Sequence, residues 1–350
     1  MKLLEVTSES GTYNVNLGQG LLPDCLKRGT AILADEKIAR LFHLSSEKLI
    51  TVEANEIQKS LETVSSVISA MKKLGLSRDS TLLVIGGGFI QDIGTLSSAL
   101  YMRGIRWEYV PTSFMAMVDS CLGGKSSINV EGYKNLIGNI FPPREIHVDV
   151  SFASTLNPVA IACGMSEAIK ICYARGPKEF EKFLELKNGV QNINSDLGVE
   201  LVTHILEAKK WFIESDEFDT GIRQLLNFGH TFGHALESGT SFKVPHGIAI
   251  GLGMMAAIDF YQEFSGNSEK ELQSEICTIL APVKYEIHSG LHNFDSKIFA
   301  DSFSSDKKNT DLYFNPILSV NGRLEKIEVE RTESNLSKIK RSMEKVVELW

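Results

Sequence analysis

Short apolar runs alternate with amphipathic segments along the first part of this chain. One amphipathic segment, Ser60 to Leu76, has the apolar spacing of a helix. Runs followed by helical segments in this order are typical of β-α-β units around a parallel sheet. The runs that predict strands are TAILAD (Thr30 to Asp35), KLITVE (Lys48 to Glu53), TLLVIGGG (Thr81 to Gly88), WEYVPTS (Trp107 to Ser113) and EIHVDV (Glu145 to Val150).

Beyond about Ser151 the pattern changes to longer helical segments with few β-branched runs, as at 178–187, 198–215 and 248–264. The expected fold is therefore α/β in its first part and helical in its second. We predict an N-terminal nucleotide-binding domain with a parallel sheet over 1–150, followed by a mainly α-helical domain over 151–350.

Composition narrows the class of protein. The 350 residues are enough for two hydrophobic cores, and the net charge of -8 argues against a general nucleic-acid binder. We see no signal peptide and no apolar run long enough to cross a membrane. The five scattered cysteines, without CxxC spacing, are typical of cytosolic thiols. We expect a cytoplasmic protein that binds neither nucleic acid nor membrane, while local Lys and Arg clusters leave a phosphorylated substrate open.

Two histidine-bearing stretches, LLNFGHTFGHALE (Leu225 to Glu237) and VPHGIAIG (Val244 to Gly251), carry the most chemical information. Together with GMSEAIK (Gly164 to Lys170) they offer one carboxylate and several imidazoles from separate segments. Such a set suits a catalytic zinc with open coordination positions.

The spacing of His230 and His234 places both on one helical face, which Asn227 and Glu237 share. One histidine of the pair is enough as a ligand, and the other can then face the substrate. The pair alone fits equally well with histidines that only decorate a helix, because it lacks the glutamate of the zinc-protease motif.

Gly86, Gly87 and Gly88 follow an apolar strand and precede a helix-forming segment. Glycines at such a turn let backbone N–H groups approach a pyrophosphate, and the helix dipole favours the anion. The spacing is not GxGxxG, so a tight turn without a ligand remains an alternative. Asp92 near the helix start either meets a cofactor hydroxyl or stabilises the helix dipole.

The segment from Val118 to Gly138 carries charged and amide side chains among glycines and small hydroxyl residues, which allow close backbone approach to a ligand. Its Lys125 and Lys134 are candidates for phosphate or carboxylate contacts. Other polar segments also carry cations, and taken singly we interpret each of them as a solvated surface charge. They are Arg103, Lys209, Arg223, Lys307 and Lys308.

In combination these motifs resemble the 3-dehydroquinate synthase family, within the wider group of sugar phosphate cyclases. The resemblance runs from about Glu56 to Lys308 in matching order and spacing. The matching stretches are GGGFIQDIGTLSSALYMRGIRWEYVPTS, VDSCLGGKSSINVEGYKNLIG, GMSEAIK, TGIRQLLNFGHTFGHALE and VPHG.

This resemblance implies a carbon–oxygen lyase that holds NAD as a recycled cofactor and binds Zn²⁺, with Co²⁺ as a possible substitute. The implied reaction converts 3-deoxy-arabino-heptulosonate 7-phosphate to 3-dehydroquinate and phosphate. Its steps are transient oxidation, β-elimination of phosphate, reduction and aldol closure, as in the shikimate pathway to aromatic amino acids.

The resemblance also implies roles for individual residues. The metal ligands would be Glu167, His230 and His246. The NAD contacts would be Asp35, Glu56, Lys59, Gly86, Gly87, Gly88, Phe89, Ile90, Gln91, Asp92, Thr112, Ser113, Asp119, Lys125, Lys134, Phe152, Ala153, Ser154 and Thr155. The substrate contacts would be Lys125, Asn135, Lys170, Lys209, Arg223, Asn227, His234 and Lys307. Arg103 matches an arginine that reaches the neighbouring subunit's active site, which implies a homodimer.

Three positions depart from the family pattern. The segment Glu53-Ala54-Asn55-Glu56 keeps only the last acid of a PDGE-like turn. Val130 stands where a histidine is common, and Gln91 where glycine is usual in the phosphate turn.

Three other functions remain open. The chain could be another sugar phosphate cyclase of the valiolone or inosose type, a metal-dependent dehydrogenase of the glycerol dehydrogenase type, or a non-enzymatic binding protein. Arg223 and Asn227 favour a substrate that bears a carboxylate. The dehydrogenase should lack the lysine-rich loop and should release NADH.

Overall fold

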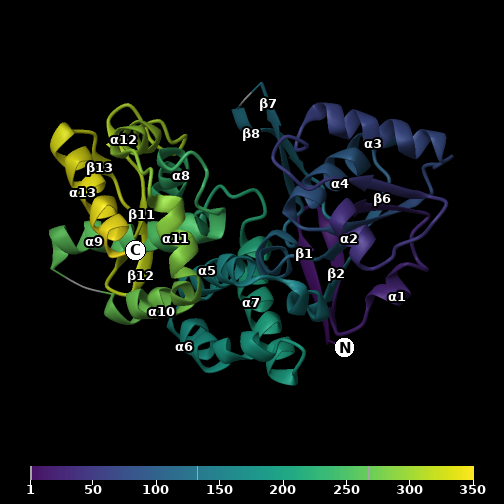
Figure 1. Cartoon of the computed structure of the whole chain (residues 1–350), viewed down its shortest axis with the longest axis horizontal. Coiled ribbons are helices and arrows are strands. Elements are labelled where there is room, and N and C mark those ends of the chain that lie inside the picture. The colour runs from purple at the N-terminus through teal and green to yellow at the C-terminus, as the bar shows by residue number, and fades with distance from the viewer. Residues whose placement is uncertain (1, 132, 267–268) are drawn as a thin grey trace. The chain divides into compact units, whose positions relative to one another are not determined.

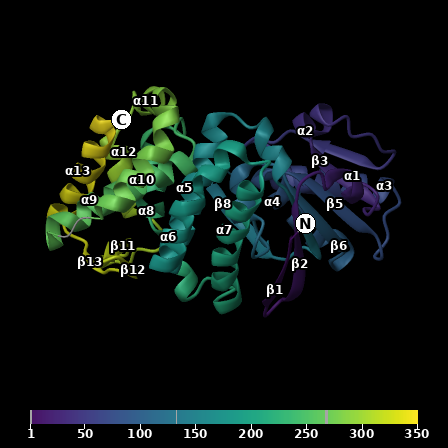
Figure 2. The same ribbon diagram turned by 90° about the horizontal axis from the view of Figure 1, so that it is seen from below.

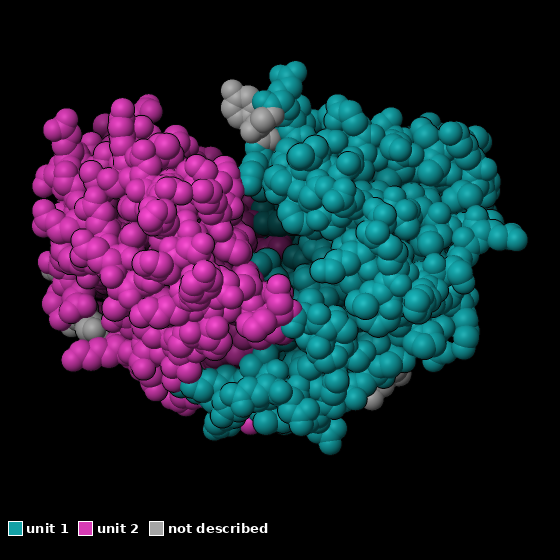
Figure 3. Space-filling model, viewed as in Figure 1, with its two compact units in different colours: residues 1–156, 184–218 teal, residues 157–183, 219–350 magenta. Residues whose placement is uncertain are grey.

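The structure is a computed structural model, and it describes residues 2–131, 133–266 and 269–350. The chain forms two compact units, coloured separately in Figure 3. Unit 1 contains residues 1–156 and 184–218, and unit 2 contains residues 157–183 and 219–350. The predicted boundary near residue 150 divides the chain into two continuous domains. In the structure the later segment 184–218 also belongs to unit 1, so each unit is made of two segments.

One seven-stranded sheet organises unit 1, with the strand order β1-β2-β9-β6-β5-β3-β4 (Figure 1). All neighbouring strands are parallel except β1 and β2, which form an antiparallel hairpin at one edge. The predicted parallel sheet and its five predicted strands are confirmed, whereas the sequence pattern missed the hairpin. The strands are β1 (Lys2–Ser8), β2 (Gly11–Gly18), β3 (Ala31–Asp35), β4 (Leu49–Val52), β5 (Thr81–Gly86), β6 (Arg106–Pro111) and β9 (Glu145–Asp149).

Side-chain caps mark where several helices of unit 1 begin. Asp35, Ser60 and Ser195 each accept a hydrogen bond from a backbone N–H of the first turn that follows them, in α2, α3 and α7 respectively. Helix α4 packs against β5 and β6 and is covered by α3, while α7 packs against β1 and β2 (Figure 2). The helices are α1 (Leu22–Cys25), α2 (Glu36–Leu41), α3 (Leu61–Lys73), α4 (Gly88–Leu100) and α7 (Asp196–Ser215).

A second hairpin, β7 (Lys125–Val130) with β8 (Tyr133–Ile140), forms from the glycine-rich polar segment. Its inner side is anchored by Ile128, which is fully buried where β7 packs against α4. On the other strand Leu136 is 63% exposed. The sequence did not predict these strands because small and polar residues dominate the segment.

Unit 2 is mainly helical, as predicted, with two short two-stranded sheets, β10–β13 and β11–β12. No helix within the described residues has the length and apolar character needed to span a membrane. The helices are α5 (Pro158–Arg175), α8 (His230–Gly239), α9 (His246–Ser265), α10 (Lys270–Leu280), α11 (Lys284–Leu291), α12 (Ser296–Ser304) and α13 (Glu333–Leu349), and α6 (Pro177–Leu186) spans the change of unit. The strands are β10 (Tyr313–Phe314), β11 (Ile317–Val320), β12 (Arg323–Lys326) and β13 (Val329–Glu330).

Glycines bring three of these helices into backbone contact. A Cβ at Gly253 of α9 would lie 2.2 Å from the carbonyl oxygen of Gly229, immediately before α8. A Cβ at Gly247 of α9 would lie 2.4 Å from the carbonyl oxygen of Cys163 in α5. Any side chain at these two positions would push the helices apart, so the glycines fix how closely α5, α8 and α9 converge.

Candidate active site

The glycine turn joins β5 to α4 at the carboxyl edge of the unit 1 sheet. Gly87 is the N-cap of α4, and no side chain caps this end of the helix. A Cβ at Gly87 would lie 3.2 Å from Oγ of Ser113, and one at Gly86 would lie 2.6 Å from Cβ of Ile90. The turn therefore requires glycine, and the first N–H groups of α4 have no intrahelical partner there. This arrangement can hold a pyrophosphate.

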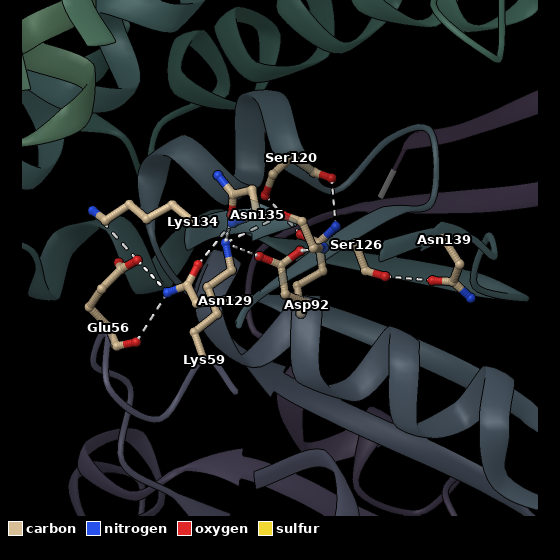
Figure 4. Close-up of polar contacts among 11 residues, drawn as sticks. Glu56, Lys59, Asp92, Ser120, Ser126, Asn129, Lys134, Asn135 and Asn139 are labelled. Atoms are coloured by element: carbon tan, nitrogen blue, oxygen red, sulfur yellow. Dashed lines mark hydrogen bonds and ion pairs between the residues drawn. The ribbon is translucent and has the colours of Figure 1, made fainter. Parts of the chain in front are cut away.

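A network of charged and amide groups lies beside this turn (Figure 4). Nζ of Lys59 is 2.8 Å from Oδ2 of Asp92 and donates to Oδ1 of Asn135 at 2.7 Å. The second carboxylate oxygen of Asp92 accepts from the N–H of Ser127 at 3.0 Å. Burial raises the pKa of Asp92, although the charge and hydrogen bond of Lys59 oppose that shift. The network ties α4 to the hairpin that carries Asn135.

Glu56 and Lys134 meet at the outer end of the same network (Figure 4). Nδ2 of Asn129 donates to Oε1 of Glu56 at 2.7 Å, and Nζ of Lys134 lies 3.5 Å from that oxygen. Oδ1 of Asn129 accepts from the N–H of Asn135, whose φ is +53°. The acid that survives in the 53–56 segment therefore contacts two residues of the lysine-bearing hairpin.

Asp119 and Lys209 form a half-buried ion pair within unit 1. Asp119 lies in a π-helical turn, η2 (Ala116–Ser120), and Lys209 lies on α7. Nζ of Lys209 donates to both the backbone oxygen and the carboxylate of Asp119. The pairing explains how residue 209, distant in sequence, joins the residues near the nucleotide-binding edge.

The other predicted cofactor contacts of unit 1 follow strands that end at this edge of the sheet. They are Asp35 at the end of β3, Thr112 and Ser113 after β6, and the 3-10 segment Val150–Thr155 after β9. Burial raises the pKa of Asp35, which also caps α2. Because ligands of open α/β sheets bind at the carboxyl ends of strands, these positions fit a nucleotide site.

In unit 2 the predicted metal ligands converge from α5, α8 and α9. Oε1 of Glu167 lies 3.5 Å from Nε2 of His246 and 3.9 Å from Nε2 of His230. The ligand atoms of His230, His234 and His246 lie within 4.8 Å of one another. The structure thus brings together all three predicted ligands and the second histidine of the helical pair.

Hydrogen bonds at the second ring nitrogen orient two of these imidazoles. Nδ1 of His246 is 3.1 Å from Oε2 of Glu237, and Nδ1 of His230 is 3.3 Å from the carbonyl oxygen of Phe228. Each Nδ1 therefore carries a hydrogen, and each Nε2 is turned towards Glu167. The sequence analysis placed Glu237 on the face of the histidines but gave it no role.

The protonation of the cluster suits metal binding. Desolvation lowers the pKa of His230 well below its ordinary value, and it lowers the pKa of His234 to about 4. Desolvation also acts on His246, but the hydrogen bond and charge of Glu237 outweigh it and raise the pKa. Nζ of Lys170 donates to Oε2 of Glu167. One oxygen of Glu167 is therefore tied to a cation, and the other faces the imidazoles.

The predicted substrate residues of unit 2 lie in four segments, and Lys170 on α5 and His234 on α8 belong to the cluster just described. Arg223 is buried in a 3-10 segment, Ile222–Asn227, that precedes α8 and also carries Asn227. Lys307 is exposed, whereas Nζ of Lys308 pairs with Asp306 at 2.7 Å. The charge of Lys308 is one of the causes that lower the pKa of His234. Lys308 is therefore the lysine of this segment that lies near the imidazoles, which spacing alone did not reveal.

Arg103 lies in unit 1, and the residues that line its pocket include none of those in the network around Asp92. It lines a pocket of about 830 Å³ together with Arg78, Arg106 and Arg144. Arg103 has a φ of +68°, which follows a φ of +51° at Met102. This strained turn presents a fourth guanidinium to an already cationic pocket.

The fold and these two groups define a class of two-unit proteins with a nucleotide-type α/β unit and a helical unit rich in metal donors. Its solved members include 2-deoxy-scyllo-inosose synthase, with a TM-score of 0.80 and 22% identity over 98% of this chain and 99% of that one. Another is 2-epi-5-epi-valiolone synthase from Streptomyces hygroscopicus, with a TM-score of 0.79 and 20% identity over 97% of each chain. A probable glycerol dehydrogenase from Sinorhizobium meliloti shares the fold at a TM-score of 0.57 and 11% identity, covering 96% of each chain.

The chain belongs to the 3-dehydroquinate synthase family. Family models for the N-terminal and C-terminal parts of 3-dehydroquinate synthase match residues 49–163 and 164–309. The 3-dehydroquinate synthase of Clostridium acetobutylicum is 30% identical over 338 residues, which cover 91% of this chain and 93% of that protein. That of Clostridium beijerinckii is 35% identical over 289 residues, which cover 81% of each.

Proposed function

We propose that this chain converts 3-deoxy-arabino-heptulosonate 7-phosphate to 3-dehydroquinate and phosphate. The observation that carries the proposal is the convergence of Glu167, His230 and His246 in a chain of this family. The solved 2-epi-5-epi-valiolone synthase has NAD⁺ and Zn²⁺ bound, and a 2-deoxy-scyllo-inosose synthase is complexed with carbaglucose-6-phosphate, NAD⁺ and Co²⁺. We extend the cofactor pair to this chain: NAD, and Zn²⁺ or Co²⁺.

The residues of unit 1 fit NAD. The glycine turn has no side chains, so a pyrophosphate can approach the first N–H groups of α4. The acids Asp35, Glu56 and Asp92 lie at the same edge of the sheet. We assign the N-terminal domain, about 1–150, to NAD binding through the predicted contacts. Lys59 pairs with Asp92, Lys134 lies beside Glu56, and Lys209 pairs with Asp119.

The residues of unit 2 fit a divalent metal such as zinc. Two imidazoles and one carboxylate oxygen are donors of the type and number found at catalytic zinc sites, which keep positions open for water or substrate. Glu237 and the carbonyl of Phe228 orient the two imidazoles from behind. We assign Glu167, His230 and His246 as ligands, and the C-terminal domain, about 151–350, to metal and substrate binding.

The reaction needs groups that bind anions and move protons. When bound, NAD would accept and return a hydride, and the metal would polarise the alcohol oxygen. His234, with its pKa lowered to about 4, is neutral at pH 7, so its imidazole can accept a hydrogen bond from a substrate hydroxyl. Arg223 presents paired donors that match a carboxylate, and Asn227 adds an amide.

Further assignments complete the substrate site and the setting of the enzyme. We assign Lys170 and the lysines at 307 and 308 in unit 2, with Lys125, Asn135 and Lys209 in unit 1, as contacts to the anionic substrate. The cytoplasm is the proposed location, because all five cysteines are free thiols and reducing compartments keep thiols in that state.

We also propose a homodimer in which Arg103 reaches the active site of the partner subunit. The cationic pocket around Arg103 supports this assignment, because four guanidinium groups favour an acidic or phosphorylated neighbour. Light scattering of the purified chain tests the dimer, and a monomer at micromolar concentration would contradict it.

A substrate panel tests the proposed reaction. Phosphate release and product identity are measured with 3-deoxy-arabino-heptulosonate 7-phosphate, sedoheptulose 7-phosphate and glucose 6-phosphate. We expect turnover of the heptulosonate alone, without accumulation of NADH. Efficient cyclisation of sedoheptulose 7-phosphate would favour another sugar phosphate cyclase, and one NADH per substrate would favour a dehydrogenase.

Arg223→Ala sharpens the same test. We expect it to lose at least about tenfold in kcat/KM on the heptulosonate, since a charge-assisted contact contributes about 1.5–3 kcal/mol. Metal content should stay near that of the unaltered chain, whereas the thermal midpoint should fall, because Arg223 is buried. Arg341→Ala on α13 removes an exposed arginine instead and serves as the matched control.

A further inference from the structure

A pair of hydrogen bonds joins the first turn of α4 to the π-helical turn η2. Nε2 of Gln91 donates to the carbonyl oxygen of Ser120 at 2.7 Å, and Oε1 of Gln91 accepts from Oγ of Ser120 at 2.7 Å. Gln91 is 2% exposed, whereas its partner Ser120 is half-buried. Two bonds between the same two residues fix both the distance and the orientation of the turn relative to the helix.

The residues on either side of this pair belong to the proposed cofactor site. Ser120 follows Asp119, which accepts from Lys209 through two oxygens. A Cβ at Gly88 would lie 3.8 Å from Oγ of Ser120, so the serine hydroxyl lies next to the glycine turn. A glycine at position 91 would make neither bond.

We propose that Gln91 is a positioning residue for NAD binding. It fixes Ser120, and with it Asp119, at a set distance from the glycine turn Gly86 to Gly88. The inference rests on the proposed function, because NAD is the ligand whose contacts with the turn and with Asp119 would be aligned. Gln91 itself needs no contact with the cofactor.

A merely structural role would have a different signature. Loss of a buried hydrogen bond lowers stability wherever it occurs, so thermal unfolding alone does not separate the two roles. A positioning role also predicts weaker NAD binding and faster amide hydrogen exchange in residues 116–120 of the cofactor-free protein. These two measurements decide between the roles.

The test uses the full chain, with NAD⁺ binding measured by isothermal titration calorimetry. Gln91→Met keeps the buried volume without the amide, and we expect it to raise the Kd about fivefold, the effect of a neutral hydrogen bond or two. Ser120→Ala removes one bond and should raise the Kd about threefold. The double variant should match Gln91→Met, because both changes break the same link.

Tyr101→Phe is the control. It removes a buried hydrogen bond from the tyrosine hydroxyl to the carbonyl oxygen of Leu76, 2.8 Å long, beyond the far end of α4. It should lower the thermal midpoint and leave the Kd for NAD⁺ unchanged.

Each outcome bears on a separate claim. An unchanged Kd in Gln91→Met, or additive effects in the double variant, would overturn the positioning role and leave the proposed function standing. Absence of NAD⁺ binding by the unaltered chain would overturn both. If Gln91→Met does not fold, Ser120→Ala, which deletes a single oxygen atom, provides the same two readouts.

Discussion

Two groups of side chains in the described part of the chain each bring three potential metal ligands within 4.8 Å of one another. One group is the cluster of His230, His234 and His246 in unit 2. The other is Glu108, Glu145 and His147, on the neighbouring strands β6 and β9 of unit 1. Because the ligand atoms of both groups are similarly spaced, the difference in charge between the groups shows what a metal site needs besides spacing.

The unit 1 group already includes a cation of the chain. Arg28 donates to Oε2 of Glu145, and its Nη1 lies 3.7 Å from Oε2 of Glu108. Nε2 of His147 is 2.9 Å from the same oxygen of Glu108. The carboxylates are therefore neutralised by side chains, and we interpret the group as a structural ion-pair network.

The unit 2 group is built from imidazoles, two of which turn Nε2 towards one carboxylate oxygen. Lys170 pairs with Oε2 of Glu167, and the other oxygen faces His230 and His246. Desolvation keeps His230 neutral, as a metal ligand must be. The comparison teaches that spacing alone does not define a metal site. The type of donor matters as well, and so does a cation of the chain, such as Arg28, that already neutralises the carboxylates.

The largest expected effect separates the two groups directly. His246→Ala should reduce bound zinc from about one equivalent to less than about a tenth, because a three-ligand site loses one of its donors. Phosphate release should fall by about a thousandfold, since the metal supplies several kcal/mol of charge stabilisation. Metal content is measured by atomic absorption after dialysis against a metal-free buffer.

His147→Gln is the matched control for that experiment. It removes an imidazole from the unit 1 group and should leave zinc content and phosphate release near those of the unaltered chain. Full zinc retention in His246→Ala, or loss of zinc in His147→Gln, would reverse our interpretation of the two groups.

A smaller effect is expected from the residue that orients His246. Glu237→Gln keeps the size of the side chain but replaces the carboxylate that accepts from Nδ1 of His246. Residues that hydrogen-bond a metal ligand typically contribute about 10–100-fold to metal affinity, and we expect a loss in that range. Competition with a chromogenic chelator measures the affinity. Glu286→Gln, an exposed substitution on α11, should change nothing.

The sequence predicted those parts of the fold that a periodic pattern specifies. Apolar runs located the parallel strands, and helical spacing located α6, α7 and α9. It missed the hairpin β7–β8, whose residues are mostly small and polar and which packs on α4, and it overlooked the alternation of buried Tyr13, Val15 and Leu17 in β2. Pairing between segments is a tertiary effect that local propensity does not contain.

The site was predictable where its residues fall within one motif. The spacing of His230 and His234 indicated a shared face, and the two lie on α8 with ring centroids 5.2 Å apart. The contact between Glu237 and His246 depends instead on how α8 packs against α9, and the proximity of Lys308 to His234 depends on the position of its loop. Neither follows from spacing along the chain.

The smallest expected effect concerns the unit 1 group and its dependence on pH. Burial raises the pKa of Glu108, but the hydrogen bond and charge of His147 and the charges of Arg28 and Arg144 outweigh it and hold the pKa below the usual 4.5. A carboxyl with a lowered pKa stabilises the folded state at pH values above 4.5, and this contribution is lost as the pH falls through the lowered value.

Glu108→Gln should therefore destabilise the protein near neutral pH, and the difference from the unaltered chain should shrink below pH 4. At pH 7 we expect a loss of about 1.5 kcal/mol, the lower end for a hydrogen bond to a charged group, because glutamine keeps one acceptor. Urea unfolding at several pH values measures the free energy of unfolding.

Asp24→Asn is the control. It removes an exposed carboxylate paired with Lys27 and should have almost no effect on stability at any pH. A loss in Glu108→Gln that is the same at pH 7 and below pH 4 would mean that packing, rather than charge, holds this group together, and the contrast with the histidine cluster would then rest on donor geometry alone.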